Sequence, residues 1–139
     1  MERLSTGLRI NSAADDAAGL AITSRMTTQI SGLNQAVRNA NDAISMLQIA
    51  DGGLANVESI LFRMKEIAVQ AGSDSNTFAD KTALQGEISE LTLEVDRIAM
   101  NTQFNNKTLL DGSVGRITIA AGANAGQTVD LNFAAIKPN

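Results

Sequence analysis

The chain has 139 residues, with 11 basic against 15 acidic residues and a formal net charge of −4. This acidic balance and the scattering of the basic residues exclude a general nucleic-acid binder, which needs clustered Lys and Arg. His, Cys, Trp and Tyr are absent and there are only four Phe, so the mainly aliphatic apolar content suits close helix packing rather than a thick globular core.

Residues 1–16 are predicted to be a helix remnant followed by an extended linker. Residues 1–7 have the pattern of a helix end with Gly7 as the stop, and such a short piece cannot nucleate alone. We therefore expect an upstream segment to be missing. Asn11 or Ser12 could cap the next helix, and Asp15 and Asp16 would lie near its first turn, where carboxylates favour the positive end of the dipole.

Residues 17–71 are predicted to form one helix roughly 80 Å long. From Met26 onward, apolar residues recur in alternating steps of four and three, the spacing of helices that wrap around one another. Two consecutive steps of three, from Ile44 to Ala50, predict a local overwinding of the supercoil. The predicted stripe consists of Met26, Ile30, Leu33, Val37, Ala40, Ile44, Leu47, Ala50, Leu54, Val57, Leu61, Met64, Ala68 and Ala71.

The other face of this helix carries amides such as Asn34, Gln35 and Asn39 rather than pairs of opposite charge. Such a face suits either a neighbouring segment that hydrogen-bonds to it or plain solvation. Gly52 and Gly53 interrupt the pattern of good helix formers, and each costs about 1 kcal/mol relative to Ala. They indicate a bend, a close contact or a break into two helices.

A loop by composition, residues 72–76, separates the long helix from a second helix at about residues 77–101. Thr77 and Asp80 form a capping-box pattern at its start. A short loop favours an antiparallel arrangement. The second helix can then cover only the C-terminal half of the first, which leaves residues 26–47 without a cover.

Residues 102–112 are predicted to be irregular, with Phe104, Leu109 and Leu110 holding them to the helix pair. The pattern then alternates with a period of two along 116–119 and 128–133, which predicts a β-hairpin in the segment 113–139. Its apolar face would consist of Ile117, Ile119, Val129, Leu131 and Phe133. The predicted fold is mainly α: one very long helix, an antiparallel second helix, together a rod over 17–112, and a small β-hairpin packed on the pair.

The sequence offers little for catalysis or metal binding. Without His or Cys there is no nucleophile–imidazole pair and no thiolate site. Asp15 and Asp16 are adjacent on a helix and diverge by about 100°, which makes a poor chelate. Glu87, Glu90 and Glu94 form an acidic strip that fits a solvated face. We therefore expect no enzyme activity, no cofactor and no metal. We also expect no membrane insertion, since no apolar run reaches about 18 residues.

Four stretches of the sequence form a recognisable series: ERLSTGLRINSAADDAAGLAI at 2–22, GLNQAVRNANDAISMLQIADGGL at 32–54, RMKEIAVQAGSDSNT at 63–77 and RIAMNTQFNNKTLLDGS at 97–113. They resemble bacterial flagellin, in family order over nearly the whole chain. The resemblance implies the N-terminal part of the rod-like inner domain of the flagellar filament subunit. It further implies an extracellular protein that serves motility and is exported without a cleaved signal peptide. C-terminal helices that complete the bundle would be missing.

The resemblance also implies partners and sites. Self-assembly with other flagellin subunits and with the missing C-terminal helices would use the seam at Met26, Ile30, Leu33, Val37, Ile44 and Leu47. Recognition by the flagellin-sensing Toll-like receptor would use Arg63, Ile67 and Glu87. An export chaperone is a further implied partner. The alternative is an isolated helical module that such a receptor or chaperone binds; an enzyme on a flagellin-like scaffold lacks candidate residues here.

Overall fold

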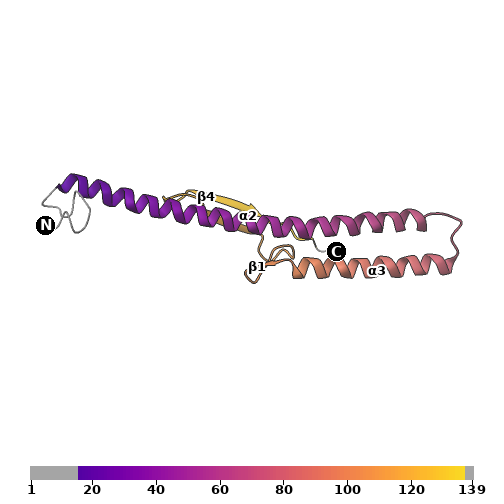
Figure 1. Cartoon of the computed structure of the whole chain (residues 1–139). Coiled ribbons are helices and arrows are strands. Elements are labelled where there is room, and N and C mark those ends of the chain that lie inside the picture. Colours follow the sequence, from indigo (N-terminus) through magenta and orange to yellow (C-terminus); the bar gives the residue numbers. More distant parts are fainter. Residues whose placement is uncertain (1–15, 137–139) are drawn as a thin grey trace, which may run out of the picture. The chain divides into compact units, whose positions relative to one another are not determined.

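The structure is a computed structural model that describes residues 16–136. Its elements, in chain order, are α2 (Ala17–Ala71), α3 (Phe78–Asn101), β1 (Gln103–Phe104), β2 (Lys107–Thr108), β3 (Arg116–Ala120) and β4 (Thr128–Asn132) (Figure 1). The predicted mainly α fold is confirmed. The described residues form two compact units, 16–41 with Ile119–Val129, and Asp42–Thr118 with 130–136.

Helix α2 begins at a cap that the sequence only partly indicates. The Asp16 carboxylate accepts a hydrogen bond from the Gly19 N–H at 2.9 Å, which satisfies a free donor of the first turn. Asp16 therefore stands just before the helix and caps it. The alternative caps Asn11 and Ser12, together with Asp15 and the predicted remnant 1–7, lie outside the described residues.

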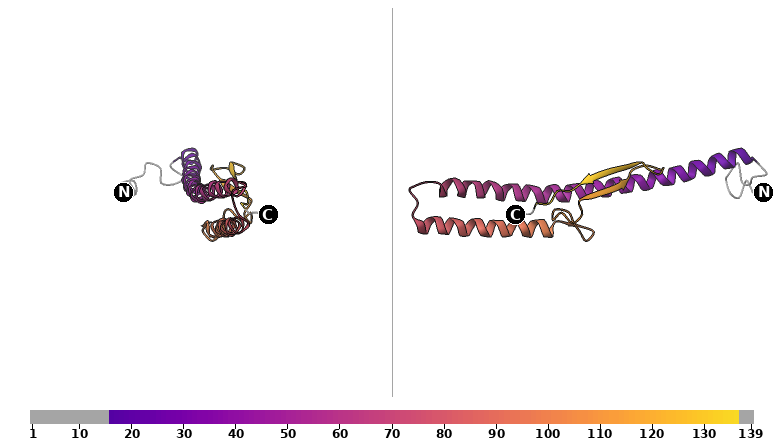
Figure 2. Two further views of the ribbon diagram at one scale, coloured as in Figure 1. Left: turned by 90° about the vertical axis from the view of Figure 1, so that its right-hand side faces the viewer. Right: turned by 180° about the vertical axis from the view of Figure 1, so that it is seen from behind.

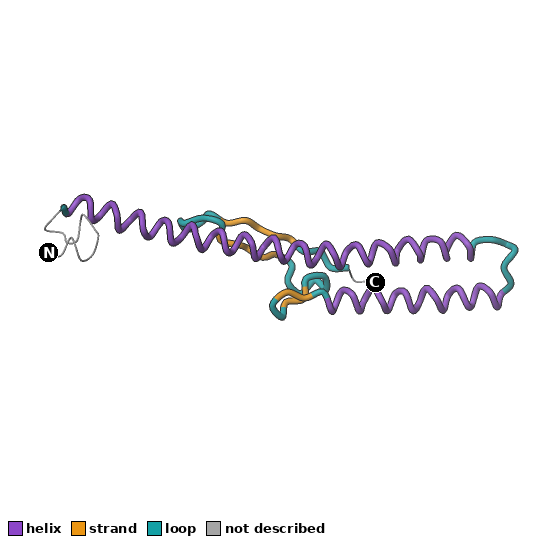
Figure 3. Tube along the Cα trace, viewed as in Figure 1, coloured by secondary structure: helices purple, strands orange, loops and turns teal. Residues whose placement is uncertain are grey.

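In the second unit, α3 runs back beside the end of α2, and the loop between them is short (Figures 2 and 3). The predicted capping box is present: Asp80 N–H donates to Thr77 Oγ1, and Thr77 N–H donates to Asp80 Oδ2 at 2.9 Å. The Asp80 carboxylate accepts hydrogen bonds from the Thr77 hydroxyl and from the Thr77 backbone N–H, and these bonds, the hydroxyl's first, lower the pKa of Asp80. The box fixes where α3 starts.

The buried face of α2 differs from the predicted stripe. We call it the inner stripe, and its steps alternate between three and four without a break: Ala43, Met46, Ala50, Gly53, Val57, Ile60, Met64 and Ile67. Leu54 and Leu61, which we expected to be covered by α3 and the hairpin, are 45% and 54% exposed. The predicted stripe therefore mixed two faces beyond Leu47. The irregular step from Ile44 to Ala50 marks a change of face, and α2 continues through it as one helix.

Gly53 allows Thr102 and Leu110 to lie very close to the backbone of α2. A Cβ at this position would lie 2.7 Å from Thr102 Oγ1 and 2.9 Å from Leu110 Cδ1, whereas one at Gly52 would meet nothing within 4 Å. Of the three alternatives that the Gly pair left open, the close contact is present. There is no break, because α2 is helical through both residues.

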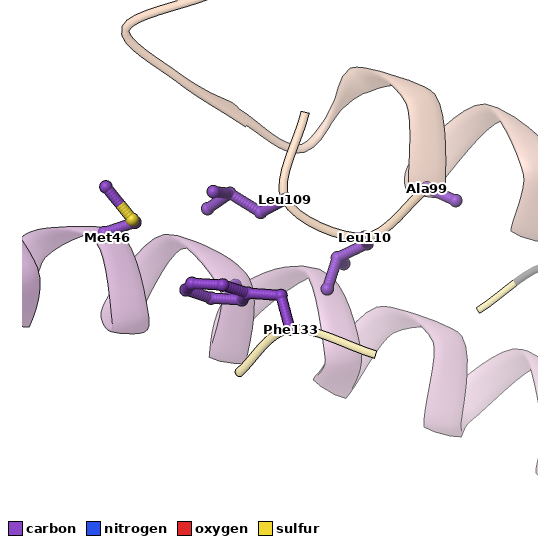
Figure 4. Close-up of a cluster of buried hydrophobic side chains, with 6 residues drawn as sticks. Met46, Ala99, Leu109, Leu110 and Phe133 are labelled. Atoms are coloured by element: carbon purple, nitrogen blue, oxygen red, sulfur yellow. The ribbon is translucent and has the colours of Figure 1, made fainter. Parts of the chain in front are cut away.

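A cluster of buried side chains holds the second unit together (Figure 4). Met46 and Ala50 come from α2, Ala99 from α3, Leu109 and Leu110 from the segment after β2, and Phe133 from the end of the chain. Phe104, Ile117 and Leu131 pack against it. The prediction that residues 104, 109 and 110 anchor the segment after the second helix is confirmed, since Leu109 and Leu110 are 0% and 2% exposed.

The segment that we expected to be irregular contains a second, very short hairpin. Strands β1 and β2 pair antiparallel, Gln103 opposite Thr108 and Phe104 opposite Lys107. Asn105 and Asn106 connect them with φ values of 46° and 61°. Two successive positive φ values are typical of a type I′ turn, for which Asn is one of the few suitable residues.

Hairpin β3–β4 is present as predicted, but part of its expected apolar face is not covered. Val129 is 51% exposed, whereas Phe133 is 9% exposed. In the first unit, the hairpin tip reaches the N-terminal half of α2. A Cβ on Gly32 would lie 3.1 Å from Ala123, and the Asn39 side chain donates a hydrogen bond to Ala120 O at 3.0 Å. At Asn39, the amide-rich face of α2 therefore forms a hydrogen bond with the end of β3.

Candidate functional site

Helix α2 carries a second row of apolar side chains, which we call the outer stripe. Its members are 45–60% exposed although all are large apolar side chains: Met26, Ile30, Leu33, Val37, Ile44, Leu47, Leu54 and Leu61. The six predicted seam residues are the first six of these. From residue 43 to residue 61 both stripes run along α2, so this part of the helix has one face packed against its own chain and another that is exposed. Within each unit, a row of exposed large apolar side chains of this kind marks an interaction site.

Two grooves lie along the outer stripe in the second unit. The larger has a volume of about 540 Å³ and is lined by Leu47, Gln48, Ala50, Asp51, Leu54, Leu110, Asn132, Phe133, Ala134 and Ile136. The second has a volume of about 360 Å³ and is lined by Asp51, Leu54, Ala55, Val57, Glu58, Leu61 and Ile136. The two grooves share Asp51, Leu54 and Ile136. The segment after β4 therefore forms a wall along which another helix could lie.

Arg63 and Glu87, two of the three residues assigned to receptor recognition, lie together. Arg63 Nε and Nη2 donate to one oxygen of Glu87, at 2.9 and 2.8 Å, and Nη1 donates to Glu66 at 3.3 Å. Hydrogen bonds to Glu87 and then to Glu66 raise the pKa of the Arg63 guanidinium above its ordinary value. Both side chains of the pair are about half exposed, so the pair links α2 to α3 and still faces solvent.

The third assigned residue does not fit direct recognition. Ile67 is 0% exposed and belongs to the inner stripe, between α2 and α3. In this conformation its side chain cannot touch a partner, because the helix pair covers it completely. Its role in the structure is to pack the two helices beneath the Arg63–Glu87 pair.

An exposed aromatic lies next to the pair. Phe62 is 59% exposed and Val69, seven residues on, is 72% exposed. Together with Lys65, Glu66 and Gln70 they line a shallow hollow of about 570 Å³. This hollow was not predicted from the sequence; the recurrence of an apolar residue after seven positions is the signal that could have indicated it.

The described part of the chain contains neither a candidate metal site nor a candidate membrane span. Within residues 16–136, no group of three or more His, Cys, Asp or Glu side chains could hold a metal ion. No helix in the same range has both the length and the hydrophobicity to cross a bilayer. The surface features that stand out are therefore the outer stripe with its grooves and the Arg63 pair.

Comparison with known proteins gives the family. The profile of the bacterial flagellin N-terminal helical region matches residues 1–115. The chain belongs to the flagellin family. It is 52% identical to the flagellin of Clostridium tyrobutyricum over 97% of this chain, and 50% identical to that of Halalkalibacterium halodurans over 96%. It spans only 35% and 49% of the length of those two relatives.

Two solved structures are similar in fold to about two thirds of this chain. The crystal structure of Bacillus cereus flagellin matches with a TM-score of 0.64 and 33% identity, over 70% of this chain and 58% of that one. The structure of FliC from Burkholderia pseudomallei matches with a TM-score of 0.60 and 42% identity, over 64% of this chain and 34% of that one. Family membership agrees with the resemblance that the four sequence stretches indicate.

Proposed function

We propose that this chain is part of a structural subunit of the bacterial flagellar filament, which serves motility and is extracellular. The observation that carries the proposal is the outer stripe, a row of large apolar side chains about half exposed along a long helix. Burying such a row in an assembly removes apolar surface from water, which drives association. Membership of the flagellin family favours this structural role over an isolated binding module and over an enzyme.

The proposed partners along the outer stripe are other flagellin subunits and helices of the same protein that lie outside this chain. A further proposed partner is an export chaperone, for which the support is the same exposed apolar row before assembly. Export without a cleaved signal peptide belongs to this proposal as well, and it rests on the family resemblance.

The experiment that tests the structural role is Ile44→Asp in the full-length source protein. The change places a carboxylate in the middle of the outer stripe, where its desolvation in an assembly is costly. We expect loss of filaments by electron microscopy while the monomer keeps its helicity by circular dichroism. Asn34→Asp introduces the same charge on the amide-rich face and is the matched control. Normal filaments from the Ile44 variant would remove this residue from the seam.

We also propose recognition by the flagellin-sensing Toll-like receptor through Arg63 and Glu87. Support comes from their half exposure and from the two hydrogen bonds that join their side chains. Arg is frequent among residues that dominate interfaces, since its guanidinium donates in several directions. Ile67 would contribute only through packing, because it is fully buried.

A further inference from the structure

The outer stripe changes character after Leu47. It continues at the same spacing, but Asp51 and Glu58 now alternate with Leu54 and Leu61 in steps of three and four. Both carboxylates are exposed. Neither makes an ion pair or hydrogen bond with any residue in the range 16–136.

The two free carboxylates line the grooves described above. Asp51 lines both grooves and Glu58 lines the second, while Leu54, Leu61 and Ile136 supply apolar walls. Seven residues separate the carboxylates, which is about 10 Å along a helix. The result is an apolar channel with two like charges at a helical repeat distance.

We propose that this channel binds an amphipathic helix that carries two basic residues one heptad apart, beside its apolar seam. The apolar seam would cover Leu54 and Leu61, and each basic side chain would meet one carboxylate. Charge complementarity of this kind selects the partner and its register more than it adds affinity. The inference rests on the proposed function, because it specifies the chemistry of the helix that covers the outer stripe.

The described part of a second copy cannot supply this helix. Within residues 16–136 the basic residues are Arg25, Arg38, Arg63, Lys65, Lys81, Arg97, Lys107 and Arg116, and no two of them are seven positions apart. Arg63, Arg97 and Arg116 are moreover already paired with acidic side chains. The occupant is therefore a helix of different sequence from α2 and α3.

The test uses the 139-residue chain and two synthetic helical peptides of about four heptads. The peptides have identical Leu seams and differ only at two flanking positions one heptad apart, which are Lys in one peptide and Glu in the other. Fluorescence anisotropy at low salt should give the Lys peptide roughly tenfold tighter binding, and about 0.5 M salt should reduce this difference. The double variant Asp51→Lys with Glu58→Lys should reverse the preference.

Asp74→Lys with Glu90→Lys is the matched control, since it changes the net charge equally at exposed positions away from the grooves. It should leave the preference for the Lys peptide intact. Equal binding of both peptides would overturn the charge selection and leave the apolar seam standing. Binding of neither would overturn both the inference and the seam. Self-association of the chain that the Asp51–Glu58 double variant abolishes would instead identify a second copy as the occupant.

Discussion

Gly53 of α2 faces Thr102, the residue that caps the C-terminus of α3. The space between them holds a hydrogen atom but not a methyl group. A Cβ at this position would lie 2.7 Å from Thr102 Oγ1, and that hydroxyl donates to Ile98 O at 2.8 Å. The contact lets the end of α3 lie directly on the backbone of α2. Gly lowers the helix propensity of α2 at this position, but it permits close packing between the two helices.

Gly53→Ala should destabilise the helix pair, although Ala is the better helix former. Overpacking costs typically 1–3 kcal/mol, and the gain in propensity returns about 1 kcal/mol. We expect a net loss of roughly 1 kcal/mol, measured by urea unfolding followed by circular dichroism. Gly52→Ala is the control at the neighbouring position, where a Cβ would meet nothing within 4 Å. This change should raise the free energy of unfolding by about 0.5–1 kcal/mol. Equal effects of the two changes would contradict the close contact.

Thr77→Ala should weaken the start of α3 and alter its response to acid. Loss of the cap should lower the melting temperature by roughly 3–5 °C at neutral pH. In the wild-type chain the pKa of Asp80 is lowered on folding, so its contribution is complete above the ordinary value of 3.8 and is lost as pH falls through the folded pKa. The difference between the two proteins should therefore shrink in acid. A difference that is constant with pH would separate Asp80 from the cap.

The loop between β1 and β2 offers a paired test of backbone conformation. Asn106 has a φ of 61°, which Gly adopts freely and Ala adopts at a cost of about 1–2 kcal/mol. Asn106→Gly should leave stability equal or higher by about 0.5 kcal/mol, since Asn-Gly is the preferred type I′ pair. Asn106→Ala should lower it by about 1 kcal/mol. If Ala were tolerated as well as Gly in thermal unfolding, the turn would not have this conformation in solution.

Arg63→Ala should reduce receptor signalling and barely change helicity. The pair with Glu87 is half exposed, so its loss should shift the melting temperature by no more than about 2 °C. Because each side chain orients the other, Glu87→Ala added to Arg63→Ala should reduce signalling less than the product of the single effects. The measurement is a reporter-cell assay on full-length protein, with Arg97→Ala, whose Arg pairs only within α3, as control. Unchanged signalling by the Arg63 variant would remove this residue from the proposed site.

Much of the fold can be predicted from the sequence because its determinants are local. Both helices, the capping box at Thr77 and Asp80, and hairpin β3–β4 follow from spacing, turn composition and side chains a few residues apart. Each of these conclusions needs no knowledge of a third element.

The separation into two stripes could not be predicted in the same way. A list of apolar positions at alternating steps of three and four cannot tell one face from two neighbouring faces, and the inner stripe includes small residues such as Ala50 and Gly53. The burial of Ile67 likewise depends on the register between α2 and α3. Hairpin β1–β2 was not predicted, because strands of two residues each leave no alternating pattern. The Asn105–Asn106 pair is the signal that could have indicated it.

The uneven cover of α2 implies a gradient of local stability within one helix. Residues 21–31 are all exposed, so their helical hydrogen bonds are supported by little besides their neighbours along the chain. Around Val57 and Ile67, by contrast, α3 covers the helix. Amide hydrogen exchange should therefore be fastest near residue 21 and slowest between residues 57 and 67. Protection of residues 26–47 on mixing with other subunits would report docking of a partner directly.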